Sequence, residues 1–285
     1  MVKTFTNTDN KDFIRSVDYG FLEQEVEHQG KKLRYFGLPG ENLYDAIVWK
    51  ELLDEIVAVE RGSKSDPYSK QNLLVCKALQ LGVFNKLTLL RGEINEIILN
   101  DKDEIGSRIP YPFELVNLDY GGSILYPDRL RIDALETLVS RQRPLDFILL
   151  ITSNVREFDR DELLETQRRI HQEILHYRAD IKRESDSYFE LINKEEPVFR
   201  QVLHLHFLVK YLGEVNKYKT TCFPAICYQG SKKTDLIHYI FRFRYQKGGS
   251  TRVVSDQSLI EILNQGFKQL IDGKLKDIKP PFTIS

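Results

Sequence analysis

The chain has 285 residues and a formal net charge of −1, and 41% of its residues are hydrophobic and 29% charged. This composition is typical of a globular protein with a sizeable core. The balanced charge argues against a generally basic nucleic-acid-binding protein, although local basic surfaces stay compatible with it. No apolar run approaches the ~20 residues of a membrane span, and the first residues lack an apolar signal segment. We therefore expect a cytoplasmic protein without membrane contact.

The cysteines and histidines do not predict a metal site. The three cysteines, Cys76, Cys222 and Cys227, contain no C-x-x-C pair, which favours core positions over a disulfide framework or a zinc site. His204 and His206 alternate in an apolar stretch, but no further ligands follow them at a recognisable metal-binding spacing. We expect these two histidines to pack within a helix or to lie at a solvated edge.

Residues 31–61 predict a βαβ unit with a ligand-binding turn. Apolar residues 33–36 and 56–59 indicate two strands around a helix at about 42–53. Gly37, Leu38, Pro39 and Gly40 form a turn after the first strand, and Glu60 closes the second. A glycine turn followed roughly 20 residues later by an acid is typical of nucleotide-binding α/β folds, in which the acid binds ribose hydroxyls.

The turn lacks the G-x-G-x-x-G spacing of dinucleotide-binding proteins. Glu41 follows it directly, and an acid at a helix start repels a pyrophosphate. The turn thus favours a ligand with ribose and a positive charge, and it disfavours an NAD-dependent enzyme.

The rest of the chain continues the α/β alternation. We predict strands at 86–90, 113–118 and 145–152, and helices at about 67–81, 94–99 and 128–140. The almost uninterrupted apolar run at 145–152 is typical of a parallel strand buried on both faces. Residues 220–228 and 236–246 predict an antiparallel hairpin, followed by an amphipathic helix at 257–270 and a polar tail.

These elements predict a doubly wound, mostly parallel, seven-stranded Rossmann-like sheet with a terminal antiparallel hairpin and a helical insertion. We divide the chain into an N-terminal helical cap at 1–30, a Rossmann-like domain at 31–158 and 218–285, and a helical insertion at 159–217. The insertion exceeds an ordinary crossover in length, which is why we treat it separately. The first 30 residues are interpreted as a cap on the fold or an arm over the ligand.

Five βα units followed by a hairpin resemble the class I S-adenosylmethionine-dependent methyltransferases, over about residues 33–152 and 218–246. The resemblance implies S-adenosylmethionine as the cofactor. It implies that the turn Gly37–Gly40 lies beside the methionine part of the cofactor and that Glu60 binds the ribose. Glu93 and Asn95, after the third strand, are similar to the residues that contact adenine in this family, and the sequence Gly-Glu-x-Asn is equally an ordinary helix start.

The fourth strand ends in Asn117-Leu118-Asp119-Tyr120. It is similar to the Asn/Asp-Pro-Pro-Tyr motif of amino-methyltransferases that act on nucleic acids, with leucine and aspartate in place of the prolines. The resemblance implies that Asn117 and Asp119 align a target amine and that Tyr120 stacks on a base, which makes nucleic acid the expected substrate. A basic-aromatic strip that includes Arg242 and Arg244 is a further candidate surface for nucleic acid.

Two observations leave a second interpretation open. The replaced prolines and the proline within the glycine turn also fit a catalytically inactive methyltransferase-fold subunit or scaffold, whose protein partner would bind the helical insertion. The sequence Asn-Leu-Asp-Tyr-Gly-Gly is in addition an ordinary strand-to-turn sequence.

Overall fold

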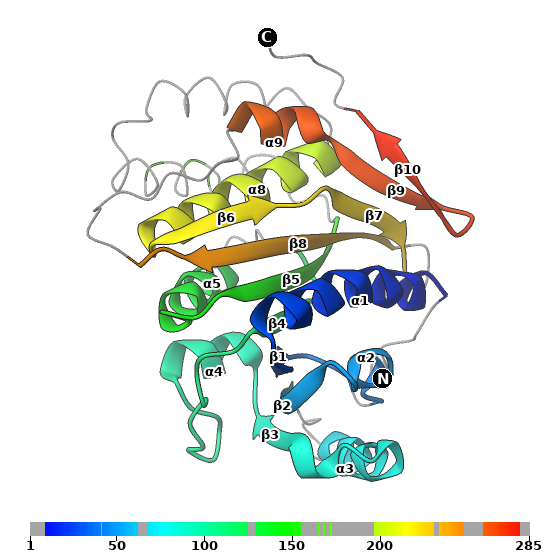
Figure 1. Cartoon of the computed structure of the whole chain (residues 1–285), viewed down its shortest axis with the longest axis vertical. Coiled ribbons are helices and arrows are strands. Elements are labelled where there is room, and N and C mark those ends of the chain that lie inside the picture. The colour runs from blue at the N-terminus through cyan, green and yellow to red at the C-terminus, as the bar shows by residue number, and fades with distance from the viewer. Residues whose placement is uncertain are drawn as a thin grey trace.

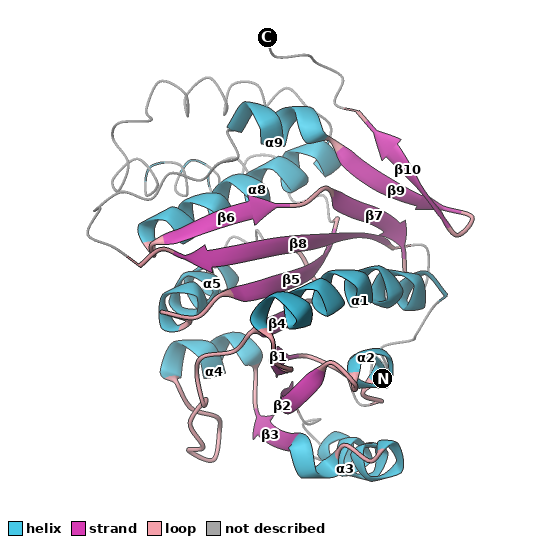
Figure 2. Ribbon diagram, viewed as in Figure 1, coloured by secondary structure: helices cyan, strands magenta, loops and turns pink. Residues whose placement is uncertain are grey.

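A computed structural model describes residues 9–40, 42–61, 68–124, 129–155, 165, 168, 172, 197–230, 234–247 and 259–279. In these residues ten strands form one sheet in the order β10-β9-β7-β8-β5-β4-β1-β2-β3, and β6 also pairs with β8. The strands are β1 (Leu33–Gly37), β2 (Leu53–Glu60), β3 (Leu87–Arg91), β4 (Leu115–Asp119), β5 (Phe147–Asn154), β6 (Tyr218–Cys222), β7 (Ala225–Gln229), β8 (Asp235–Tyr245), β9 (Phe267–Ile271) and β10 (Lys274–Ile278). Figures 1 and 2 show this sheet between its helices.

The order of the first five strands confirms the predicted fold class. Strands β3-β2-β1-β4-β5 are parallel neighbours, the arrangement of a doubly wound Rossmann-like sheet. All eight residues of β5 are buried, as its apolar run predicts for a strand covered on both faces.

Helices cover both faces of the parallel strands (Figure 1). The helices α1 (Asp9–Gln29), α2 (Tyr44–Trp49) and α3 (Ser69–Leu81) supply Leu22, Trp49 and Leu74 to the core on one face. On the other face, a larger core includes buried side chains from α4 (Ile94–Asn100), α5 (Leu130–Arg141) and α8 (Pro197–Val215). None of the helices in the described ranges has both the length and the hydrophobicity of a transmembrane span.

The predicted strand at 220–228 is two strands. β6 ends at Cys222 and β7 begins at Ala225, and both pair antiparallel with β8. Phe223 and Pro224 separate them, because proline has no N–H to donate to a sheet. β8 itself runs antiparallel to β5 from Phe147 to Asn154, which confirms the predicted antiparallel addition to the parallel sheet.

The prediction for the C-terminal residues is wrong. Within the helix predicted at 257–270, α9 covers only Leu259–Gln265, and residues 267–278 form the hairpin of β9 and β10. Residues 257–258 and 280–285 lie outside the described residues. Asp272 and Gly273, with φ of 49° and 71°, make the tight turn that an Asp-Gly pair favours between twisted strands. The sheet accordingly has ten strands in the described residues rather than seven.

Two other segments differ in detail from expectation. α2 ends at Trp49 and β2 begins already at Leu53, so the helix is shorter and the strand longer than predicted. Leu52 and Leu53 are both buried. Of the range predicted as a helical insertion, α8 packs into the same core as α4 and α5. Apart from residues 165, 168 and 172, the part of this range before α8 lies outside the described residues.

Candidate functional site

The candidate site lies where the strand order reverses. β1 is flanked by β2 and β4, so the connections after β1 and β4 leave the sheet in opposite directions. Doubly wound folds bind ligands in the crevice outside the carboxyl ends of such strands. We call the edge at which β1 to β5 end the carboxyl edge.

The turn after β1 begins with a glycine that no other residue can replace without movement. A Cβ atom on Gly37 would lie 2.1 Å from the carbonyl oxygen of Asn117, to which the Leu38 N–H donates a hydrogen bond of 3.1 Å. Gly40 has a φ of +70°, and space around it is open. Pro39 is buried, and Leu38 packs against the larger core. The turn is therefore held closely to the end of β4.

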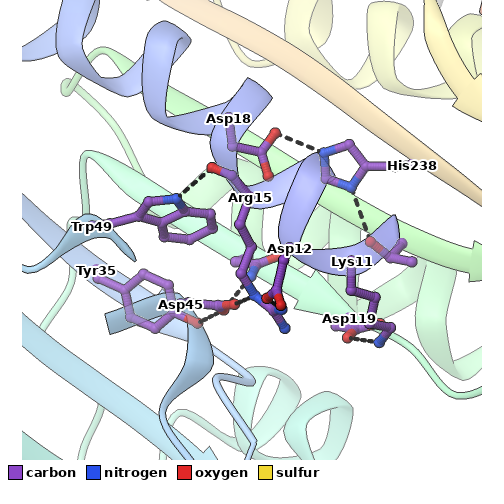
Figure 3. Close-up of polar contacts among 11 residues, drawn as sticks. Lys11, Asp12, Arg15, Asp18, Tyr35, Asp45, Trp49, Asp119 and His238 are labelled. Atoms are coloured by element: carbon purple, nitrogen blue, oxygen red, sulfur yellow. Dashed lines mark hydrogen bonds and ion pairs between the residues drawn. The ribbon is translucent and has the colours of Figure 1, made fainter. Parts of the chain in front are cut away.

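Asp45, in the first turn of α2, gathers three donors beside this turn (Figure 3). Its carboxylate accepts hydrogen bonds from Arg15 Nε at 2.9 Å, Tyr35 OH at 3.1 Å and Asn117 Nδ2 at 2.6 Å. Burial raises the pKa of Asp45, and the charge and hydrogen bond of Arg15 oppose that rise. Trp49 Nε1 donates to the Arg15 carbonyl at 3.0 Å, which fixes α1 against α2.

The second acid at the carboxyl edge is Asp119, which ends β4. Its Oδ2 accepts a hydrogen bond of 2.7 Å from Lys11 Nζ on α1, and both side chains are largely buried. Side chains alternate along a strand, so Asn117 and Asp119 face α1 together. The structure thus brings these two predicted catalytic residues to one cavity.

A row of polar side chains continues from Asp119 across the sheet. Asp119 is paired in register with Thr152 on β5, and Thr152 with His238 on β8. Thr152 Oγ1 lies 2.9 Å from His238 Nδ1, and His238 Nε2 lies 2.9 Å from Asp18 Oδ1 on α1. Thr152, His238 and Asp18 are all buried.

These groups line a small cavity between α1 and the sheet. Its volume is about 20 Å³, enough for roughly one water molecule or hydroxyl group. Its lining comprises Lys11, Ile14, Arg15, Asp18, Asp45, Trp49, Asn117, Asp119, Thr152, Tyr228 and His238.

The predicted cofactor residues at the end of β2 and after β3 lie elsewhere along the same edge. Glu60 accepts a hydrogen bond of 3.2 Å from Lys70 on α3. Glu93 caps α4 by accepting from the backbone N–H groups of Asn95 and Glu96, and Asn95 Nδ2 donates to its other oxygen at 2.8 Å. Both carboxylates therefore have partners within the chain, and neither lines the cavity.

Tyr120, the third predicted catalytic residue, faces away from Asn117 and Asp119. Its OH donates a hydrogen bond of 2.8 Å to Asn95 Oδ1, and the guanidinium of Arg131 lies 4.8 Å from its ring centre. The ring is buried in the larger core, and burial raises the pKa of its hydroxyl. In this arrangement the ring is not exposed for stacking on a base.

The basic-aromatic strip on β8 is bound to α1. Arg244 makes a bidentate pair with Glu25, with N–O distances of 2.6 and 2.7 Å, and Arg242 Nε lies 3.7 Å from the same carboxylate. His204 and His206 are buried on α8, which agrees with helix packing and excludes the solvated edge that we also considered.

Sequence reasoning missed most of the residues around the cavity. Asp45 follows the glycine turn closely enough to have been a candidate. Arg15 and Asp18 gave a weaker signal, as polar residues inside an amphipathic pattern. Thr152 and His238 gave none, because their role depends on the pairing of β5 with β8.

No family model matches the chain, and no curated protein matches it in sequence. Among solved structures, it is similar to an O-methyltransferase from Bacillus cereus in complex with SAH (13% identity, TM-score 0.44, covering 84% of this chain and 83% of that one). It is also similar to a SAM-dependent methyltransferase from Agrobacterium tumefaciens (13% identity, TM-score 0.43, covering 82% of this chain and 62% of that one). A third similar structure is TomG, an O-methyltransferase from Streptomyces achromogenes in complex with SAM (12% identity, TM-score 0.42, covering 85% of this chain and 92% of that one).

Proposed function

We propose that the chain is a class I methyltransferase-like protein that binds S-adenosylmethionine at the carboxyl edge of β1, β2 and β4. The observation that carries this proposal is the close turn at Gly37, at the point where the strand order reverses, with Asp45 and Asp119 beside it. A nucleotide-like ligand binds at this point in doubly wound folds.

The charges near the turn fit the amino-acid end of this cofactor. That end carries an ammonium and a carboxylate, and two acids, Asp45 and Asp119, lie beside the turn with two cations, Arg15 and Lys11. The ligand would exchange partners with these internal ion pairs. Glu60, at the end of β2, would accept hydrogen bonds from the ribose, as its spacing from the turn predicts. Adenine contacts from Glu93 and Asn95 stay a prediction.

The cofactor, when bound, supplies a methyl group on a positively charged sulfur. The chain's own contribution is to hold an acceptor in line with that group, since alignment provides most of the gain in such a transfer. Asn117 and Asp119 would take this role, and their positions at the end of β4 and in the lining of the cavity support the proposal. A nucleic-acid acceptor stays a prediction and gains no support, because Tyr120 is buried and Arg242 and Arg244 contact Glu25.

Calorimetric titration of the protein with S-adenosylmethionine tests the proposal. We expect binding, and we expect Glu60→Gln to weaken it about 10-fold, because a charged hydrogen bond to the ribose contributes ~1.5 kcal/mol. The matched control is Glu51→Gln, which alters an exposed acid after α2 and should leave the affinity unchanged. An absence of binding, or equal affinities for the parent and Glu60→Gln, contradicts the proposal.

A catalytically inactive subunit or scaffold is the second candidate. The observation that favours it is that Lys11 and Arg15 already neutralise Asp119 and Asp45, while Pro39 is buried in the turn. On this alternative the folded protein does not bind S-adenosylmethionine, and it is recovered in a stable complex with a protein partner that binds within 159–217. Calorimetry with the cofactor and size-exclusion chromatography of the affinity-purified protein distinguish the two candidates.

A further inference from the structure

We infer that Thr152, His238 and Asp18 form a proton relay that accepts a proton from a hydroxyl group on the methyl acceptor. The inference rests on the proposed function and narrows its acceptor to an alcohol or a phenol. It assigns a role to three buried groups that the turn and the cofactor contacts do not use.

The geometry is a chain of two hydrogen bonds that begins at the cavity. Thr152 Oγ1 and His238 Nδ1 are 2.9 Å apart, and His238 Nε2 and Asp18 Oδ1 are also 2.9 Å apart. Sheet register sets the first contact, because Thr152 and His238 are directly paired residues of β5 and β8. Helix α1 supplies the second. All three residues line the cavity, and Asp119 is the register partner of Thr152 on its other side (Figure 3 labels Asp18, His238 and Asp119).

The partners determine the direction of each hydrogen bond. An aspartate carboxylate can only accept, so Asp18 requires the proton of His238 on Nε2. The Nδ1 lone pair then accepts the hydroxyl proton of Thr152. The Thr152 oxygen keeps its own lone pairs. The Tyr228 hydroxyl is a hydrogen-bond partner of Thr152, and an acceptor hydroxyl in the cavity would take its place at Thr152 Oγ1 or share that oxygen with it. This is the order of donor, base and orienting acid that activates hydroxyl groups in enzymes generally.

A relay of this kind suits an oxygen acceptor. A neutral amine already has a lone pair for the methyl group, whereas a hydroxyl oxygen becomes a strong nucleophile only as its proton leaves. The acceptor proton would pass to Thr152 Oγ1 while the threonine proton passes to His238 Nδ1. The acceptor oxygen would bond to the methyl carbon as the carbon–sulfur bond breaks and its electrons pass to sulfur, and Asp18 would balance the imidazolium charge.

The size of the cavity and the charges around His238 agree with this assignment. About 20 Å³ holds a single hydroxyl group, so the rest of the acceptor would lie outside the cavity. Besides Asp18, the cavity presents Asp119, Asp45, Lys11, Arg15 and Tyr228.

The first test needs no turnover. Nitrogen-15 NMR of the full chain with labelled histidine should show His238 protonated on Nε2, and Thr152→Val should shift the Nδ1 resonance because that nitrogen loses its donor. Ser153→Ala is the matched control, since Ser153 neighbours Thr152 on β5 and points to the opposite face of the sheet. A proton on Nδ1, or no response to Thr152→Val, overturns the relay.

The second test measures methyl transfer from tritium-labelled S-adenosylmethionine to phenol, catechol and benzyl alcohol, with aniline as the amine control. We expect a hydroxyl compound to be methylated and Thr152→Val and His238→Gln to lower kcat about 100-fold, with KM and cofactor affinity retained. Thr152→Ser, which keeps the hydroxyl, should restore most of the rate.

Transfer to aniline alone overturns the inference, and so does transfer that Thr152→Val leaves intact. The absence of transfer to all three hydroxyl compounds by a protein that binds the cofactor overturns it while the cofactor proposal stands. If calorimetry shows no binding of the cofactor, both the proposed function and the relay are overturned. The two proposals can therefore fail separately, and the experiments show which one has failed.

Discussion

His206 is a buried imidazole that makes the stability of the fold depend on pH. It lies in α8 with its ring edge-on to Tyr239 and Phe241, at centroid distances of 5.7 and 5.6 Å. Burial lowers its pKa to about 3. The unfolded chain binds a proton at this residue below about pH 6.5, whereas the folded chain stays unprotonated until about pH 3.

Replacing His206 with phenylalanine should remove this dependence. Between pH 6.5 and 3 the unfolded state binds one proton more at this residue than the folded state does. The unfolding free energy therefore decreases as pH falls through this window. We expect the unfolding free energy of His206→Phe to fall less steeply with pH than that of the parent over this window. The difference between the two slopes should be about 1.4 kcal/mol per pH unit.

Urea denaturation at a series of pH values measures this slope. His28→Gln is the control, because His28 is exposed near the end of α1. Equal slopes for the parent and His206→Phe would show that His206 does not titrate with the lowered pKa.

At the residue scale, part of the candidate site could be predicted from the sequence. Asn117 and Asp119 end a strand with a clear apolar pattern, and parallel strands bring their carboxyl ends to one edge. Tyr120 follows them directly, but the alternation of side chains turns it to the other face. Lys11 and His238 could not be predicted, since their partners lie 108 and 220 residues away.

At the element scale, α1 is held to the sheet by polar contacts as well as by apolar packing. Its buried residues are Ile14, Arg15, Asp18, Leu22 and Glu25, a helical stripe that includes three charged side chains. The apolar pattern of this region predicts a helix, yet hydrophobicity alone assigns those charged residues to solvent. Their burial depends on Asp45, His238 and Arg244, which the chain supplies from α2 and β8.

The ion pair between Glu25 on α1 and Arg244 on β8 can be tested by a single substitution. Burial alone would raise the pKa of Glu25, but hydrogen bonds from Arg244 and Gln29 outweigh it and lower the pKa. We expect Glu25→Gln to cost about 2 kcal/mol of unfolding free energy at pH 7, because a bidentate charged pair is lost.

The pH dependence of Glu25→Gln has a definite sign. A carboxylate with a lowered folded pKa stabilises the fold above its unfolded pKa of about 4.5 and loses that effect as pH falls through the folded pKa. The deficit of the variant should shrink below about pH 4.5 in thermal or urea unfolding. Glu27→Gln, an exposed substitution on the same helix, is the control. A deficit that is constant with pH would contradict the ionic contribution.

For the whole molecule, the parallel half of the sheet could be predicted and the antiparallel half only in part. Strands β1 to β5 alternate with helices, and right-handed crossovers allow few arrangements of such a chain. The C-terminal hairpin was missed because its strands are short and half-exposed, so their periodicity is weak. Asp272-Gly273 was the available signal, since an Asp-Gly pair favours a tight hairpin turn.

This asymmetry predicts how protection from hydrogen exchange is distributed over the sheet. β5 is buried along its whole length between β4 and β8, whereas β10 lies at an edge with exposed or half-buried residues and pairs with β9. Local opening needs least free energy where few apolar contacts hold a strand. We expect amides of β10 to exchange about 100-fold faster than those of β5, a difference of ~3 kcal/mol in opening free energy.

Hydrogen-exchange mass spectrometry on the full chain measures the exchange rates of the two strands. Equal protection of both strands would instead mean that the hairpin and the parallel sheet open as one cooperative unit.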